Sequence, residues 1–158
     1  VPNWDQLRAW KEEGLARYIG VSRNAARHFP DIIGLMETGT VDIAQVNYSV
    51  LEPEAEEHVL PLAMDMGIAV NINRAFLNGD YFSLVSGKEL PSWAADFDCE
   101  SWAQLSLKFI LSHPAVTCVI TDTSNPEHAI DNIGGGFGRL PNEEERERIA
   151  AHIRGLSA

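Results

Sequence analysis

Basic residues are scarce in this sequence of 158 residues, and no long apolar run occurs in it. Lysine and arginine together number 12 against 23 aspartates and glutamates, which gives a formal net charge of −11. Because this charge repels phosphate-rich surfaces, we expect neither nucleic acid nor a membrane as a partner. No apolar segment approaches the roughly 20 residues that cross a bilayer, and no basic leader precedes an apolar stretch.

Cysteine is rarer still, since Cys99 and Cys118 are the only two. Two cysteines so placed do not suggest a disulfide framework, which fits a reducing compartment, and we expect a cytoplasmic protein. Cys118 lies in the apolar run 116–120 and is predicted to be a small buried residue. Neither the cysteines nor the histidines show metal-ligand spacing, so no metal site is predicted.

The sequence is typical of a single domain. Its length and its 45% hydrophobic content are enough to bury one core without a disulfide or metal, and we expect residues 1–158 to form one unit. The first residue is Val1 instead of methionine, so either a segment was removed or this is a piece of a longer reading frame. The sequence alone does not choose between these explanations.

Helical and strand patterns alternate along the chain. Apolar spacing predicts helices over residues 2–13, 24–36, 54–66, 101–112, 125–133 and 143–156, with Pro30 kinking or delaying the second. Strands are predicted over residues 17–21, 41–48, 68–72 and 116–120, and a long loop follows the third through Pro91. Strands that are apolar on both faces and separated by helices are typical of parallel βαβ units. This pattern alone fits either an open doubly wound sheet or part of a (βα)8 barrel.

Polar side chains recur at every second position near the ends of the strands. Residues two apart on a strand share a face, which groups Gln45, Asn47 and Ser49, then Asn71 and Asn73, then Thr121 and Thr123, while Ser22 ends the first strand. An unpaired buried amide costs about 1–3 kcal/mol, so clustered amides need partners. A polar ligand at the carboxyl ends of the strands would supply them, although the amides could instead pair with one another or with trapped water.

A second candidate site is the helix that begins at Asn125 and Pro126. Free backbone N–H groups and the positive end of the helix dipole suit a phosphate, which His128 could also contact. Asp122 would repel a dianion there, and Asn125 is equally well explained as a plain N-cap. The glycine-rich stretch 134–138 follows a helix instead of joining a strand to one, so it is predicted to be a flexible turn.

Several segments match one known family, in its order and across nearly the whole chain. They are Gly14–Ser22, Ile43–Ser49, Leu60–Ala63 with Gly67–Val70, and the longest, Leu107–Ile120, which continues through His128 to Asn132. These segments resemble the fifth, sixth, seventh and eighth strands of the aldo/keto reductases, with the helices between them.

The resemblance implies an α/β fold that is half of a TIM (βα)8 barrel, with four parallel strands and flanking helices. A complete barrel needs about 250 residues, which this chain does not have. In the family, a tyrosine protonates the carbonyl oxygen of a small substrate while NADPH delivers hydride. That tyrosine and its Asp, Lys and His partners come from the first four strands, so the resemblance assigns no catalytic residue to this chain.

Three hypotheses follow for the function. The leading one is a fragment or truncated member of an oxidoreductase family that is inactive alone. The second is a non-catalytic half-barrel that binds a cofactor or serves in assembly. The third is an unrelated doubly wound domain, which is disfavoured because no strand is followed by a glycine-rich phosphate loop.

The resemblance also implies which residues would bind NADP or NAD. Ser22 and Gln45 would hydrogen-bond the nicotinamide carboxamide, and Asn73 and Arg74 would lie at the nicotinamide and pyrophosphate. The adenosine end would be formed by Thr121, Thr123, His128, Asp131 and Asn132.

The sequence departs from the family at three of these places. The seventh strand ends in Asn73-Arg-Ala-Phe76 instead of the common Tyr-Ser-Pro-Leu, although a family branch with Asn-Arg-Pro-Phe is similar. The usual Ser-Asn pair is Ser22-Arg23, which removes a carboxamide partner unless Asn24 replaces it. The cation expected for a 2′-phosphate is missing and Asp122 lies beside the site, which favours NADH, weak NADPH binding or no cofactor.

Half a barrel would leave two strand edges unpaired and an inner face uncovered. We expect this face to be apolar and larger than soluble monomers tolerate. A homodimer, or association with a complementary half-barrel, is therefore predicted.

Overall fold

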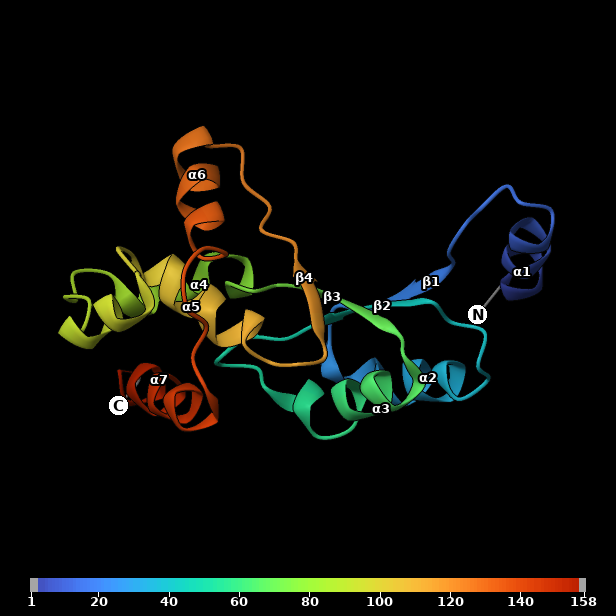
Figure 1. The fold of residues 1–158 in the computed structure, drawn as a ribbon, viewed down its shortest axis with the longest axis horizontal. Coiled ribbons are helices and arrows are strands. Elements are labelled where there is room, and N and C mark those ends of the chain that lie inside the picture. The colour runs from blue at the N-terminus through green and yellow to red at the C-terminus, as the bar shows by residue number, and fades with distance from the viewer. Residues whose placement is uncertain (1–2, 157–158) are drawn as a thin grey trace.

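The computed structural model describes residues 3–156, which form one four-stranded parallel sheet with helices around it (Figure 1). The strands follow one another in the order β1-β2-β3-β4, and their bounds are Gly20–Ser22, Ile43–Asn47, Ala69–Asn73 and Val116–Val119. All four lie where the sequence predicts strands, although β1 begins three residues late. The predicted α/β architecture of four parallel strands with flanking helices is confirmed.

The helices agree with the prediction in number and order except at one place. They are α1 (Trp4–Glu12), α2 (Phe29–Met36), α3 (Val59–Met66), α4 (Asp80–Val85), α5 (Trp102–Leu111), α6 (Pro126–Gly134) and α7 (Glu143–Gly155). Short 3-10 turns at Ala26–His28 and Glu54–Glu56 precede α2 and α3. Pro30 lies in the first turn of α2, so it delays the helix and does not kink it. Gly67 ends α3 with a φ of 66°, as predicted.

The predicted loop from β3 to Pro91 is wrong, because α4 lies within it. This helix has only six residues, too few to show a helical period, and it follows Gly79 at a φ of 104°. It is held by aromatic packing, with the rings of Phe76 and Phe82 4.8 Å apart. The hydroxyl of Tyr81 donates to the carbonyl of Trp102 at 2.9 Å, which ties α4 to α5.

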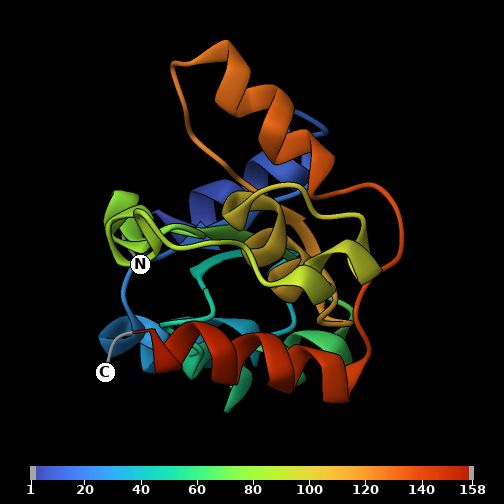
Figure 2. The ribbon, with the colours of Figure 1, turned by 90° about the vertical axis from the view of Figure 1, so that its left-hand side faces the viewer.

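One face of the sheet is covered by helices. Figure 1 shows α2 and α3 along the same side of the strands, and Val46, Val70 and Ile72, which point to that side, are fully buried. Figure 2 shows α7 on this side as well and α6 standing away from the rest of the fold on the other. None of the residues of α6 is buried.

The other face of the sheet is mostly polar near the strand ends, which corrects the expectation of an apolar inner face. Ser22, Gln45, Asn47 and Asn73 occupy the alternate positions there, at neighbouring places in the ladder. Large exposed apolar side chains lie instead on flanking segments, such as Leu15 before β1 and Ile130, Ile133 and Phe137 in and after α6.

The predicted burial of Cys118 is also wrong. β4 is an edge strand with no helix over the face that carries this thiol, so Cys118 is exposed. Its sulfur lies 3.0 Å from Oδ1 of Asn71 on the neighbouring strand. Cys99, in the loop before α5, is the buried cysteine, and burial raises the pKa of its thiol to about 11.

The glycine-rich turn after α6 is more constrained than predicted. Gly138 has a φ of 75°, and a Cβ there would clash with the carboxylate of Asp98. The fully buried Lys108 of α5 donates to the carbonyls of Phe137 and Arg139. These contacts fix the turn against α5.

No helix between residues 3 and 156 is both long enough and apolar enough to cross a membrane.

Candidate functional site

The carboxyl end of the sheet opens into a hollow of about 480 Å³, which we call the strand-tip pocket. It is lined by Ser22, Arg23, Asn24, His28, Gln45, Asn73 and Arg74. Five of the ten residues predicted to bind a cofactor therefore lie together: Ser22, Asn24, Gln45, Asn73 and Arg74.

Strand register brings these side chains side by side. Ser22 pairs with Gln45 across β1 and β2, and the backbone N–H of Arg23 donates to the carbonyl of Gln45 at 2.9 Å. Asn73 ends β3, and its Nδ2 donates to the carbonyl of Arg23 at 3.0 Å. The guanidinium of Arg23 turns back to the carbonyl of Ser22 at 2.8 Å.

Two buried polar atoms of this pocket have no partner. They are Oδ1 of Asn73 and Nε of Arg74, one an acceptor and the other a donor. Arg74 also has a left-handed backbone, with a φ of 55°, and its Nη2 lies 3.5 Å from Oε1 of Glu52. Unpaired buried groups and strained backbone both cost free energy, and both occur most often where a ligand binds. The pocket therefore fits a ligand that offers a donor and an acceptor.

A second hollow of about 590 Å³, the α6 pocket, lies between β4, α4, α5 and α6. Its apolar walls are Phe76, Phe82, Val85, Trp102 and Ala103, and its polar groups include Lys88, Ser101 and Asp122. Four more of the predicted residues line it, namely Thr123, His128, Asp131 and Asn132. Thr121 is half-buried and is not among the lining residues of either pocket. Aromatic walls with a few polar groups suit a flat heterocycle.

Several charged groups of the α6 pocket are already engaged. Asp131 accepts from Oγ of Ser101 at 2.8 Å and from Nε2 of Gln104 at 2.7 Å. Nζ of Lys88 donates to the carbonyl of Leu156 at 2.8 Å. His128 is exposed. Lys88 and His128 are thus the lining groups available to an anion, while Asp122 and Asp131 repel one, which disfavours a dianion there.

The predicted N-cap of α6 is confirmed. Oδ1 of Asn125 accepts from the backbone N–H of Glu127 at 2.9 Å, and Pro126 occupies the first turn. This bond uses one of the free N–H groups that a phosphate would need. The cap alone explains why asparagine stands at this position.

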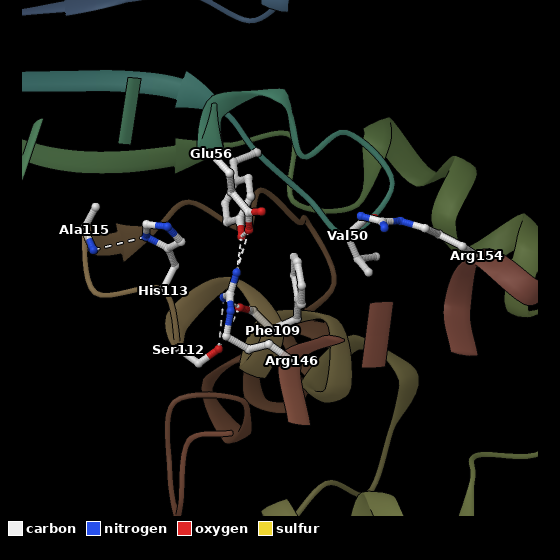
Figure 3. Close-up of polar contacts among 9 residues, drawn as sticks. Val50, Glu56, Phe109, Ser112, His113, Ala115, Arg146 and Arg154 are labelled. Carbon is white, nitrogen blue, oxygen red and sulfur yellow. Dashed lines mark hydrogen bonds and ion pairs between the residues drawn. The ribbon is translucent and has the colours of Figure 1, made fainter. Parts of the chain in front are cut away.

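Behind the sheet, a polar cluster fastens the end of β2 to α7 (Figure 3). Nη2 of Arg146 lies 2.5 Å from Oε1 of Glu56 and 2.8 Å from Oη of Tyr48. Nη1 of Arg146 donates to the carbonyl of Phe109 at 2.6 Å, and its guanidinium stacks over the Phe109 ring. Burial, followed by the hydrogen bond to Glu56, raises the pKa of Tyr48 above its ordinary value. Because its hydroxyl is bound by Arg146 of α7, Tyr48 faces α7 and points away from the strand-tip pocket. The cluster is therefore structural.

His113 lies beside this cluster, in surroundings that disfavour its protonated form. Burial, followed by the positive charge of Arg146, lowers the pKa of this imidazole. Its Nδ1 accepts from the backbone N–H of Ala115 at 3.2 Å, which places any proton on the other ring nitrogen. Among residues 3–156, no group of three or more His, Cys, Asp or Glu side chains could hold a metal ion.

Sequence reasoning missed two polar residues close to the strand-tip pocket. Spacing groups Asn47 with Gln45, but the family resemblance assigns no role to Asn47. Glu52 lies in the loop after β2, where neither a helical nor a strand repeat indicates which way a side chain points. The aromatic wall of the α6 pocket was missed as well, because it depends on the position of α4.

Comparison with known proteins matches the chain to one family. The model of the Aldo/keto reductase family matches residues 2–154. The NADH-specific methylglyoxal reductase of Escherichia coli (strain K12) is 36% identical over 88 residues, which is 56% of this chain and 26% of that protein.

Solved structures show the same fold. The holo form of aldo-keto reductase AKR11C1 from Bacillus halodurans superposes with a TM-score of 0.70 at 21% identity, covering 96% of this chain and 54% of that one. An aldo/keto reductase from Klebsiella pneumoniae in complex with NADP and acetate gives a TM-score of 0.65 at 16% identity, covering 94% and 52%. The chain thus spans about half the length of these solved relatives.

Proposed function

Because this chain belongs to the aldo/keto reductase family, we propose that it is the C-terminal half of such a barrel and binds its nicotinamide dinucleotide. The observation that carries the proposal is the pair of unpartnered atoms, Oδ1 of Asn73 and Nε of Arg74, beside Ser22 and Gln45 at the strand tips. A carboxamide and a pyrophosphate offer the donor and the acceptor that these atoms need. The strand-tip pocket and the α6 pocket would hold the two ends of one dinucleotide.

The four-stranded sheet and the half-length match to solved relatives support the view that the catalytic half lies outside this chain. We propose that the chain has no catalytic residue and is inactive alone. Tyr48, which directly follows β2, is engaged by Glu56 and Arg146, so it does not replace the missing acid.

Each predicted residue has a role in binding and orientation. Ser22 and Gln45 hold the nicotinamide carboxamide, with Asn24 on the rim, while Asn73 and Arg74 reach the nicotinamide and pyrophosphate. Thr123, His128, Asp131 and Asn132 form the adenosine end. Thr121, two residues after β4 and outside both pockets, is assigned to the same end by the family resemblance alone. When bound, the cofactor supplies the hydride that reduces a small carbonyl substrate.

NADH is the cofactor we propose. The two acids Asp122 and Asp131 outnumber the one lysine, Lys88, among the residues that line the α6 pocket, so a 2′-phosphate meets a lining that is negative in sum. The name of the relative from E. coli, an NADH-specific reductase, agrees with this preference.

A complementary half-barrel is the partner we favour over a symmetric homodimer. In this chain α1 precedes β1 and α6 follows β4, so a helix is already present beyond each edge of the sheet. In a homodimer, both copies would place a helix where the edge strands of the two sheets must pair. A complementary half that begins and ends with a strand would add no further helix there. A non-catalytic binding or assembly module is the second candidate function, supported by pockets formed without the other half.

Calorimetric titration of the chain with NADH and NADPH tests the proposal. We expect NADH to bind more tightly and Asn73→Ala to weaken it about tenfold, which is the loss of about 1.4 kcal/mol. Asn71→Ala is the control, because Asn71 lies two positions earlier on β3 and lines neither pocket. Equal dissociation constants for NADH in the two variants, or no NADH binding at all, would refute the assignment. Saturable turnover of NADH and methylglyoxal by the isolated chain would show instead that a replacement acid exists.

A further inference from the structure

The side of α6 that faces away from the α6 pocket carries exposed apolar side chains. Ile130 and Ile133 lie three positions apart on one face of this helix, and Phe137 follows in the turn after it. Their exposed fractions are 72%, 62% and 67%. His128 and Asn132, which line the α6 pocket, lie on the opposite side of the helix. The three apolar side chains are therefore separate from the proposed dinucleotide site.

These side chains border a groove of about 490 Å³ between α6 and the start of α5, which we call the outer groove. None of Ile130, Ile133 and Phe137 packs against the hydrophobic core formed by the described residues 3–156. Figure 2 shows why, since α6 stands away from the rest of the fold. Neighbouring exposed apolar side chains rimmed by polar groups mark sites of protein contact. The outer groove therefore fits a partner that brings apolar side chains of its own.

The charged residues that line the outer groove are all acidic. They are Glu100, Glu127 and Asp131, and the lining holds neither lysine nor arginine. Asp131, which the α6 pocket shares, is bound to Ser101 and Gln104. Glu100 and Glu127 are exposed and form no ion pair within the described part of the chain. Carboxylates around an apolar centre favour a partner with basic residues at the edges of its apolar face.

A second copy of this chain fits the outer groove poorly. In a symmetric dimer the same patch meets itself, so Glu100 and Glu127 of one protomer would face the same carboxylates of the other. Every copy also adds a net charge of −11. An anionic membrane surface is repelled for the same reason. The charges therefore favour a different polypeptide as the occupant.

The position of α6 in the fold indicates which polypeptide this is. β4 is an edge strand, and α6 is the helix that follows it. In a closed barrel the next strand pairs with the edge strand, and the helices that follow successive strands are neighbours in the outer ring. This chain covers only 54% of AKR11C1, which leaves the strand beyond β4 and its helix to the complementary half proposed above.

We propose that the outer groove binds a basic amphipathic helix of the complementary half-barrel, namely the helix after the strand that pairs with β4. Its apolar stripe covers Ile130, Ile133 and Phe137, and its lysine or arginine side chains reach Glu100 and Glu127. This inference rests on the proposed function, because it names the chemistry by which the two halves recognise each other. Charges at the edge of an interface mainly set the choice of partner, so these carboxylates select a basic helix over an acidic one.

Titration of the isotope-labelled chain with synthetic helices tests the chemistry by two-dimensional NMR. The probe is a peptide of about 18 residues with a leucine stripe flanked by lysines, and its matched peptide has glutamates in place of the lysines. We expect the lysine peptide to shift the amide signals of Ile130, Ile133 and Phe137 and to bind about tenfold more tightly than the glutamate peptide.

Variants at exposed positions locate the binding without risk to folding. Ile133→Gln should weaken binding of the lysine peptide about fivefold, because it removes apolar surface from the contact. Met64→Gln on α3, which also replaces an exposed apolar side chain, is the control and should leave binding unchanged. Glu127→Gln should narrow the difference between the two peptides about twofold. Equal binding of both peptides, or unchanged binding to Ile133→Gln, would overturn the inference.

The source of the helix is tested by producing this chain together with the first half of the methylglyoxal reductase from E. coli. In a complex of the two, the lysine peptide should no longer bind, whereas continued binding would show that the outer groove serves a different protein. A dimer in sedimentation velocity that Ile133→Gln abolishes would overturn the inference in favour of a second copy. Failure of the two halves to copurify would instead count against the complementary half as a partner, and so against the proposed function, whatever the peptides show.

Discussion

At the residue scale, the informative groups are buried polar atoms without partners. Oδ1 of Asn47, Oδ1 of Asn73 and Nε of Arg74 all lie at the carboxyl end of the sheet. By contrast, the polar cluster around Arg146 behind the sheet is fully engaged through Tyr48 and Glu56. An unpaired buried group costs about 1–3 kcal/mol, so the three atoms gathered at the strand ends mark the place where we propose a ligand, whereas a fourth such atom, Oγ of Ser106, stands alone on α5.

His113 should make stability depend on pH. Its folded pKa is lowered, so the unfolded state binds the proton more tightly and acid favours unfolding. The contribution is fully present above the unfolded pKa of about 6.5 and is lost as pH falls from there through the folded pKa. Urea unfolding between pH 7.5 and 5 should show a shallower decline for His113→Gln than for the parent. An equally steep decline in both proteins would contradict this role.

The sequence could predict which residues approach the site but not which atoms stay unpaired. Alternation along a strand places Gln45 and Asn47 on one face whatever the surroundings, so the clustering of amides followed from spacing alone. The orientation of the Asn47 amide depends on Glu52, which lies in a loop without a period. The prediction that Cys118 is buried failed for a similar reason, because its burial depends on whether a helix covers the edge strand.

At the scale of elements, local chemistry predicted the regular parts well. The cap at Asn125, the stop at Gly67 and the delay at Pro30 each depend on neighbouring residues in the chain, and each is where it was expected. The short helix α4 depends on ring packing with Phe76 and on a bond to Trp102, so nothing local marks it. That helix forms a wall of the α6 pocket, which is why the pocket's shape could not be predicted.

Arg146 should be the main polar link between α7 and the sheet. Its side chain is 12% exposed and reaches Tyr48, Glu56 and Phe109. Arg146→Met should lower the free energy of unfolding by about 2 kcal/mol, since it leaves Tyr48 and the partly exposed Glu56 without their partner. The control is Arg8→Met on α1, whose ion pair with Asp5 lies fully on the surface and contributes little to stability. Equal urea midpoints for the two variants would contradict the assignment.

At the scale of the whole molecule, one dinucleotide would extend along the carboxyl ends of the strands, from the strand-tip pocket to the α6 pocket. The strand-tip pocket lies over β1 to β3 and the α6 pocket lies beyond β4, and both are formed by this chain without a second one. The order of strands and the net charge of −11 followed from the sequence. How the predicted residues divide between two pockets did not, because it depends on the curvature of the sheet and on where α6 stands (Figure 2).

The most direct test is to map NADH onto the isotope-labelled chain by two-dimensional NMR. We predict shifts in two separate groups of residues, Ser22, Gln45, Asn73 and Arg74 at the strand tips and Thr123, His128 and Asn132 at α6, with α7 unaffected. Shifts confined to α7 or to the helix-covered side of the sheet, or none at saturating NADH, would contradict the view that these strand ends form one wall of a nicotinamide pocket.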